Sequence, residues 1–188
     1  MVSEELKAII DTLKNQGRQT ESDMDFFEPA TEDQISDFEK NNNLSFPSKF
    51  REWLLFSDGG ECFLPASVQF YGVAHKPLID VSNQTRPDDS YVVIGGTPNG
   101  DPVLIKKDSE TISIYNKEEG KIEEEEVYDD FFAFLNGLYD YLGMGEWILW
   151  QEIMLLVTEQ SEKHGRASGN LFLLEKAHEI GHQSNENN

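Results

Sequence analysis

The spacing of apolar residues divides the chain into three parts. Up to about residue 60, apolar positions recur every three or four residues, which is typical of helices that bury one face. After Gly60 the apolar residues come in short β-rich runs separated by turn residues, and from Asp129 onward the helical spacing returns. The order of helices, sheet and helices predicts an α+β fold.

Three helices are predicted before the sheet. The first lies near the N-terminus and ends at Gly17, and the second begins at Thr31, which forms a capping box with Gln34. The third follows Pro47 and ends at Gly59–Gly60. The side chains predicted to face the core are Leu6, Ile9, Ile10, Leu13, Ile35, Phe38, Phe50, Trp53 and Leu54.

Six runs are predicted as strands: "ECFL", "VQFYGV", "YVVIGG", "DPVLIKK", "TISIYN" and "KIEEEEV". Connections as short as "KKDSE" and "NKEEGK" join neighbouring antiparallel strands, because parallel strands need long crossovers. We therefore expect a mostly antiparallel sheet, packed by the helices that contain Trp53 and Phe134. A helix over "DDFFAFLNGLYDYLG" closes at Gly143, and two more are predicted at about 146–162 and 170–180.

Composition narrows the range of partners. The chain has 36 acidic against 15 basic residues, a net charge of −21, which disfavours binding to nucleic acids and anionic membranes. Cys62 is the single cysteine, so no intramolecular disulfide can form, and the N-terminal sequence does not resemble an export signal. The most apolar stretch, "WILWQEIMLLV", is too short to span a bilayer. We expect a cytoplasmic protein.

The acidic excess is concentrated in "EEGKIEEEEVYDD", residues 118–130 (hereafter the acidic segment), where eight acidic residues accompany only Lys121. The segment therefore carries −7 of the net charge. It is either a solvated surface that aids solubility or a docking surface for a basic protein. The candidate binding residues are Glu118, Glu119, Glu123, Glu124, Glu125, Glu126, Asp129 and Asp130.

The motif "HEIGH" near the C-terminus matches the H-E-x-x-H pattern of zinc proteases, in which His178 and His182 would bind zinc and Glu179 would polarise water. In the extended pattern the glycine and the third histidine fall at Asn185 and Asn188, so neither requirement is met. A zinc-dependent hydrolase is therefore only a remote alternative, and we expect neither metal nor cofactor.

Two other candidate chemistries are also weak. No feature brings Cys62 and His75 together as nucleophile and base, so a buried strand cysteine is the preferred interpretation. The stretch "GGTPNGD", residues 95–101, fits neither a dinucleotide nor a Walker phosphate loop, and we interpret it as a turn between strands that uses Gly and Asn for positive φ. We therefore expect no enzymatic activity.

The stretch "ATEDQISDFEKNNNLSFPSKFREWLLFSDGG" resembles the opening module of the SUKH superfamily, Smi/Knr type. The positions that match the family pattern are Thr31, Ile35, Phe38, Glu39, Leu44, Pro47, Phe50, Trp53, Leu54, Asp58, Gly59 and Gly60. Asp58 stands where the family usually has Asn. The later "IGGTPNGDPVLIKK" and "DDFFAFLNGL" resemble the family's central hairpin and closing helix.

The resemblance covers about residues 30–142. It divides the chain into an N-terminal helix and linker (1–29), a SUKH domain (30–142), and a C-terminal helical extension with a polar tail (143–188). It implies an α+β domain without known catalytic residues. It also implies two roles: bacterial immunity proteins that bind toxins, often nucleases, and fungal regulators of cell-wall glucan synthesis that act through protein partners.

Charge and resemblance together favour the first role. A nuclease toxin needs a basic groove for nucleic acid, and an acidic protein can occlude that groove. We therefore expect an immunity protein that masks a basic toxin domain, with a regulatory or scaffolding module as the alternative.

Overall fold

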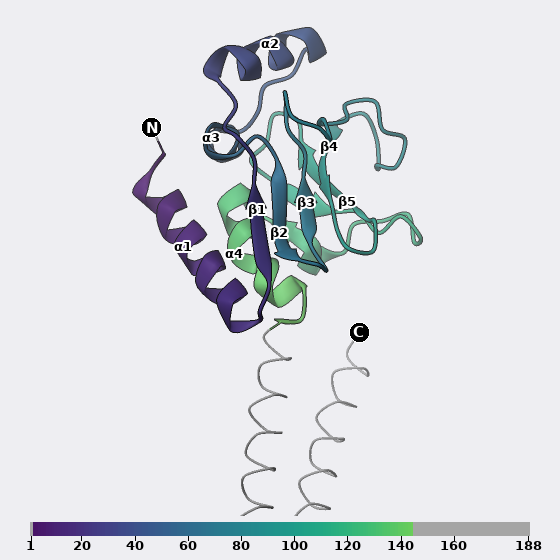
Figure 1. The fold of residues 1–188 in the computed structure, drawn as a ribbon. Helices are drawn as coiled ribbons and strands as arrows, with labels where there is room; N and C mark the ends of the chain where they lie inside the picture. Colours follow the sequence, from purple (N-terminus) through teal and green to yellow (C-terminus); the bar gives the residue numbers. More distant parts are fainter. Residues whose placement is uncertain (1, 145–188) are drawn as a thin grey trace, which may run out of the picture. The chain divides into compact units, whose positions relative to one another are not determined.

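A seven-stranded antiparallel sheet forms the centre of the computed structural model, which describes residues 2–144 (Figure 1). The strands lie in the order of the chain, and each pairs with its neighbours antiparallel. They are β1 (Asp23–Phe26), β2 (Gly60–Leu64), β3 (Val68–Phe70), β4 (Tyr91–Gly96), β5 (Pro102–Lys106), β6 (Ile112–Ile114) and β7 (Val127–Tyr128). The predicted antiparallel sheet is confirmed.

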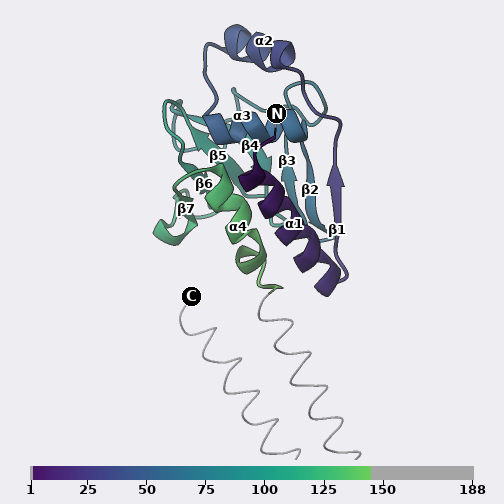
Figure 2. The same ribbon diagram turned by 90° about the vertical axis from the view of Figure 1, so that its left-hand side faces the viewer.

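Helices α1 and α4 cover one face of this sheet (Figure 2). The helices are α1 (Glu4–Gln19), α2 (Glu32–Asn42), α3 (Ser48–Phe56) and α4 (Phe131–Tyr141), with a 3₁₀ turn, η1, at Glu124–Glu126. The predicted α+β fold is therefore confirmed. No helix among residues 2–144 is long and apolar enough to cross a membrane.

The core lies between the sheet and the helices. Trp53 of α3 is fully buried, and its ring centroid is 5.2 Å from that of Phe70 on β3 and 5.5 Å from that of Phe131 on α4. Phe134 is also fully buried. The nine side chains predicted to face the core from the first three helices are buried except Phe38, which is half-buried. A layer of interlocked aromatic rings therefore joins α3 and α4 to the sheet.

The predicted capping box at the start of α2 is confirmed. The amide of Gln34 donates to Thr31 Oγ1 at 3.2 Å, and the amide of Thr31 donates to Gln34 Oε1 at 2.8 Å. Two amides that the helix leaves without partners are thereby satisfied.

Of the three predicted glycine helix ends, Gly143 is confirmed, since it follows the C-cap of α4 at a φ of 67°, and the other two are wrong. Gly17 lies inside α1, where a Cβ would lie 2.8 Å from the carbonyl oxygen of Ser22, so glycine is needed for the close approach of the returning chain. Helix α3 ends at Phe56, and Gly59 and Gly60, with φ of 104° and 131°, turn the chain into β2.

Two strand predictions also need correction. Strand β1 was not expected, because four residues reading "DMDF" give too short an alternation to distinguish from a loop. The run "KIEEEEV" is not one strand. Consecutive glutamates have low β propensity and repel one another, and they form η1 before the two-residue β7. The helices predicted at 146–162 and 170–180, and "HEIGH", lie outside the described residues.

Candidate functional site

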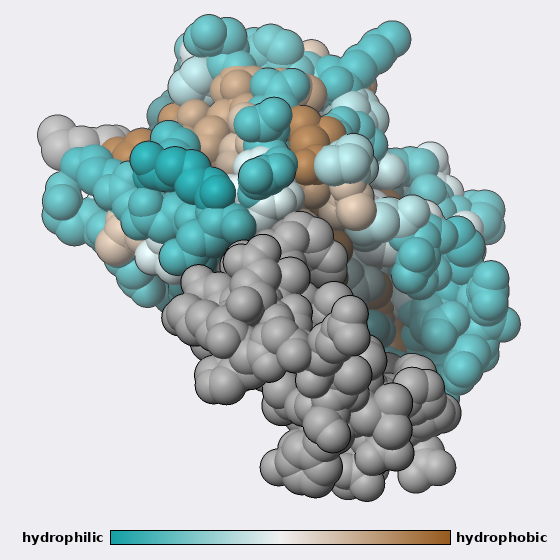
Figure 3. All heavy atoms as spheres, turned by 60° about the horizontal axis from the view of Figure 1, so that its bottom comes forward, coloured by the Kyte–Doolittle hydropathy of each residue, from teal (hydrophilic) through white to brown (hydrophobic). Residues whose placement is uncertain are grey.

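The acidic segment lies at the surface of the described domain. Figure 3 shows one face of the described residues, on which hydrophilic side chains predominate around a smaller hydrophobic area. Five of the eight candidate residues are exposed (Glu118, Glu119, Glu124, Glu125 and Asp129), and three are half-buried (Glu123, Glu126 and Asp130). The segment is thus accessible to a partner over most of its length.

Lys121 compensates part of this charge. Its Nζ lies 2.8 Å from a carboxylate oxygen of Glu119 and 2.8 Å from one of Glu123. Hydrogen bonds to these two carboxylates raise the pKa of Lys121 above its ordinary value. Five acidic residues of the segment make no ion pair within residues 2–144, namely Glu118, Glu124, Glu125, Glu126 and Asp129, and the uncompensated charge lies on these positions.

Asp101 adds a carboxylate that sequence reasoning missed. It lies at the end of the β4–β5 turn, and its charge acts on Glu126 of η1. Burial, together with the charges of Asp101, Glu123 and Glu125, raises the pKa of Glu126. No local sequence signal could have shown this, because 25 positions separate two residues that only the fold brings together.

Asp130 differs from the other candidate residues because its carboxylate has a structural role. It caps α4, accepting hydrogen bonds from the amides of Phe132 and Ala133 at 2.9 Å each, and it pairs with Lys49 Nζ at 3.0 Å. Burial raises the pKa of Asp130, but these hydrogen bonds and the Lys49 charge outweigh it and hold the pKa below its ordinary value. Its charge is therefore already compensated.

A hollow of about 640 Å³ opens beside Asp101. Successive side chains of a strand point to opposite faces of the sheet. Cys62 and Phe70 are buried on the face that the helices cover, so their neighbours Glu61 and Gln69 point to the other face, into the hollow. The lining is mainly polar and includes Glu61, Ser67, Gln69, Tyr71, Thr85 and Thr97, with Lys117 at the rim and Gly95 and Gly96 on β4. No motif in the sequence indicated this hollow.

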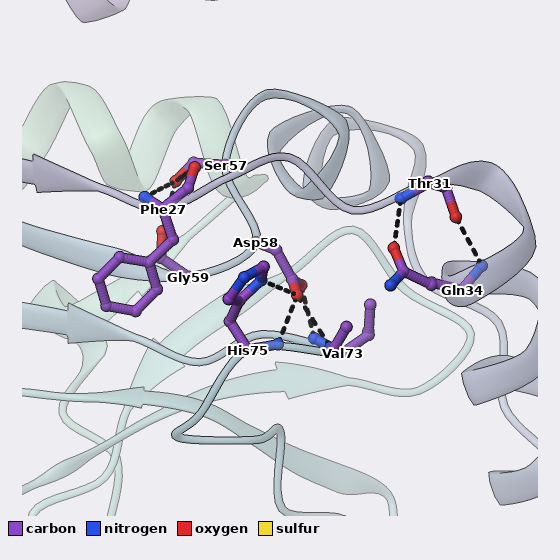
Figure 4. Close-up of polar contacts among 9 residues, drawn as sticks. Phe27, Thr31, Gln34, Ser57, Asp58, Gly59, Val73 and His75 are labelled. Carbon is purple, nitrogen blue, oxygen red and sulfur yellow. Dashed lines mark hydrogen bonds and ion pairs between the residues drawn. The ribbon is translucent and has the colours of Figure 1, made fainter.

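The remaining candidates within residues 2–144 show no catalytic geometry. Cys62 is fully buried on β2, and burial raises the pKa of its thiol to about 12, so it is not a nucleophile near neutral pH. His75 instead contacts Asp58, with its Nδ1 3.2 Å from the carboxylate (Figure 4). The "GGTPNGD" stretch connects β4 to β5 as a turn, with Gly100 at a φ of 79°. Asn99 does not have positive φ, unlike the prediction.

Comparison with known proteins gives one family. The model of the SMI1 / KNR4 family (SUKH-1) matches residues 29–137, which is more than half of the 188-residue chain. The matched range includes the hollow, Asp101 and the whole acidic segment. A comparison with curated proteins found no match.

Proposed function

Because this chain belongs to the SMI1 / KNR4 family (SUKH-1), we propose that it is a non-catalytic, cytoplasmic immunity protein that neutralises a nuclease toxin by binding over its nucleic-acid site. The family supports a protein-binding role and includes toxin immunity proteins. The choice of a basic toxin rests on the charge of this chain.

The observation that carries the proposal is the acidic surface formed by Asp101 and η1. Glu123 to Glu126 are four consecutive glutamates, and the charge of Asp101, from a distant turn, acts on Glu126. Of these five acidic residues, only Glu123 is ion-paired within the described residues. A nuclease must present Lys and Arg to phosphates, so its groove attracts this surface at long range and is covered by it on contact. Masking in this way needs no catalytic group.

The direct test takes the proteins encoded by the genes next to that of this chain and selects any that cleaves nucleic acid. We expect the purified chain to form a one-to-one complex with the nuclease and to abolish cleavage at equimolar concentration. Cleavage that continues undiminished beside a saturating amount of the chain would contradict the proposal. A stable complex with a cellular protein that has no toxic activity would instead favour the regulatory alternative.

A matched pair of variants tests the acidic surface itself. In the first, Glu123, Glu124, Glu125 and Glu126 are changed to Gln. In the second, four exposed acids elsewhere, Asp11, Glu28, Asp33 and Asp37, are changed to their amides, so that the net charge is the same. Only the first should slow association, by about tenfold at low salt, with the difference shrinking as salt is added. Equal association rates for the two variants would rule out a specific role for Glu123 to Glu126.

A further inference from the structure

The hollow lies on the sheet face opposite the helix-covered one. Part of its floor is formed by Gly95 and Gly96, which have no side chains. A Cβ on Gly95 would lie 2.4 Å from the carbonyl oxygen of Gln69, so no other residue fits there without moving β3 from β4. A Cβ on Gly96 would meet Tyr71 Oη at 3.6 Å, an ordinary contact. The space above Gly96 is therefore open because the residue is glycine, and a larger side chain could fill it.

One acidic residue, Glu61, lines the hollow, and a second, Asp25, stands opposite it on the neighbouring strand. Asp25 of the edge strand β1 pairs in register with Glu61 of β2, so both side chains are on the same face of the sheet. Neither forms an ion pair within the described residues. Within residues 2–144, the two oxygens of Glu61 accept hydrogen bonds only from neutral groups, Ser67 Oγ at 2.8 Å and Gln69 Nε2 at 3.0 Å.

Like charges directly opposite one another weaken a strand pair. Local rules of this kind are broken in natural proteins mainly at functional sites. A cation placed between Asp25 and Glu61 would remove the repulsion, and the Ser67 hydroxyl and the Gln69 amide, which also line the hollow, lie beside Glu61. This combination indicates an elongated ligand with a positive charge at one end and polar groups behind it.

We propose that the hollow receives a protruding loop of the bound toxin, and that an arginine of this loop lies against Asp25 and Glu61. The inference rests on the proposed function, because it names a second contact with the same partner. A guanidinium carries five donors in a planar fork that can serve two carboxylates at once, and arginine is abundant on surfaces that bind phosphates. A volume of about 640 Å³ accommodates only a few residues, which suits a loop tip.

The hollow and the acidic surface can belong to one interface. Lys117, on the rim of the hollow, donates its backbone amide to Asp101 Oδ1 at 3.1 Å, and Glu118 follows it in the chain. Lys117 Nζ is held by the carbonyl oxygen of Asn99 at 2.8 Å. A partner that covers the acidic surface therefore reaches the rim of the hollow.

The test needs no toxin. The full chain is titrated with the capped tripeptide acetyl-Gly-Arg-Gly-amide while backbone amide signals are followed by NMR. We expect the signals of Gln69, Gly96 and Thr97 to shift, with a dissociation constant of about 1–10 mM, as suits a single charged side chain. The glutamate tripeptide should leave these signals unchanged.

Three variants sharpen the result. Gly96→Val fills the hollow and should abolish the shifts, and Glu61→Gln removes one charge at nearly constant shape and should weaken binding by about threefold to tenfold. Asp33→Asn, an exposed acid on α2, is the matched control and should bind as the parent does. If Gly96→Val does not fold, Glu61→Gln still decides the question.

Shifts confined to residues 118–126, or equal affinities for Glu61→Gln and the parent, would overturn the assignment of the hollow. The proposed function fails separately. A chain that binds the arginine peptide in the hollow but leaves the nuclease active overturns only the toxin proposal. A chain that inhibits the nuclease equally well with and without Gly96→Val overturns only the loop-binding proposal.

Discussion

Asp58 fixes the backbone at His75 from inside the domain. The side chain of Asp58 is fully buried, and its Oδ2 accepts the amide of His75 at 2.7 Å and that of Ala74 at 2.9 Å, while Oδ1 accepts the amide of Val73 at 2.6 Å (Figure 4). Three consecutive amides thus converge on one carboxylate. The contact ties the loop after β3 to the turn between α3 and β2.

Replacing Asp58 should therefore destabilise the domain. Asp58→Ala leaves the amides of Val73, Ala74 and His75 without their acceptor and should lower the free energy of unfolding by about 3 kcal/mol. Asp58→Asn keeps one oxygen acceptor but turns an NH₂ group toward an amide donor. The free energy of unfolding should therefore fall, but by less than in Asp58→Ala. Urea unfolding of the parent and the two variants gives their free energies of unfolding. Equal values for the alanine variant and the parent would contradict a structural role for this carboxylate.

Trp53 should be the most costly core residue to truncate. It is fully buried against Phe26, Phe70 and Phe131, so Trp53→Ala should cost about 3–5 kcal/mol. Its Nε1 has no hydrogen-bond partner within the described residues, so Trp53→Phe loses volume but no polar contact and should cost clearly less. Chemical denaturation gives both values, and a loss below about 1 kcal/mol for alanine would be incompatible with this packing.

Gly95 and Gly96 should respond oppositely to alanine. At Gly95 the added Cβ clashes with the Gln69 carbonyl, and Gly95→Ala should cost about 2 kcal/mol or more. At Gly96 the Cβ meets only ordinary contacts, and the loss of unfolded-chain entropy should leave Gly96→Ala neutral or more stable by about 0.5 kcal/mol. The difference between the two melting temperatures is the measurement, and similar values would show that β3 and β4 are not this close at Gly95.

The sequence predicts what depends on near neighbours and fails where the fold brings distant residues together. The Thr31–Gln34 cap spans one helical turn, and the burial of Trp53 follows from helical spacing, so both are readable. Asp58 contacts residues 73–75, which are 15 to 17 positions further along the chain. The sequence gives no sign of this contact except an unusual acidic residue at a predicted turn.

The candidate site divides in the same way. The acidic segment is contiguous in the sequence, and its charge can be counted directly. The meeting of Asp101 with Glu126, and of Asp25 with Glu61, depends on strand register and on the path of a turn, which composition does not fix. The capping role of Asp130 was readable, because an aspartate directly before an apolar helical run is a common N-cap.

Asp130 should contribute to stability rather than to binding. Asp130→Ala removes the cap of α4 and the pair with Lys49, and should cost about 1–2 kcal/mol. Because the folded-state pKa of Asp130 lies below its ordinary value of 3.8, this contribution is present above pH 3.8 and is lost as the pH falls through the folded pKa. Thermal unfolding of the parent and the variant at neutral and at acid pH is the measurement, and the difference between their melting temperatures should shrink as the pH is lowered. If this difference stayed the same, the charge of the carboxylate would contribute little to stability.

Glu126 should show the opposite dependence on pH. Burial and the charges of Asp101, Glu123 and Glu125 raise its folded-state pKa above 4.5, so the folded domain holds this proton more tightly than the unfolded chain does. Ionised Glu126 therefore opposes folding above the folded pKa, and this penalty declines as the pH falls through that pKa and is absent below 4.5.

Glu126→Gln is neutral at every pH, so it should melt higher than the parent at pH 7, by the equivalent of about 0.5 kcal/mol, and the gain should vanish toward pH 4.5. Glu124→Gln, an exposed position on the same turn, is the control and should change the melting temperature much less. If the gain from Glu126→Gln stayed constant from pH 7 to pH 4.5, the glutamine would stabilise through packing, and the electrostatic strain inferred for the acidic surface would be absent.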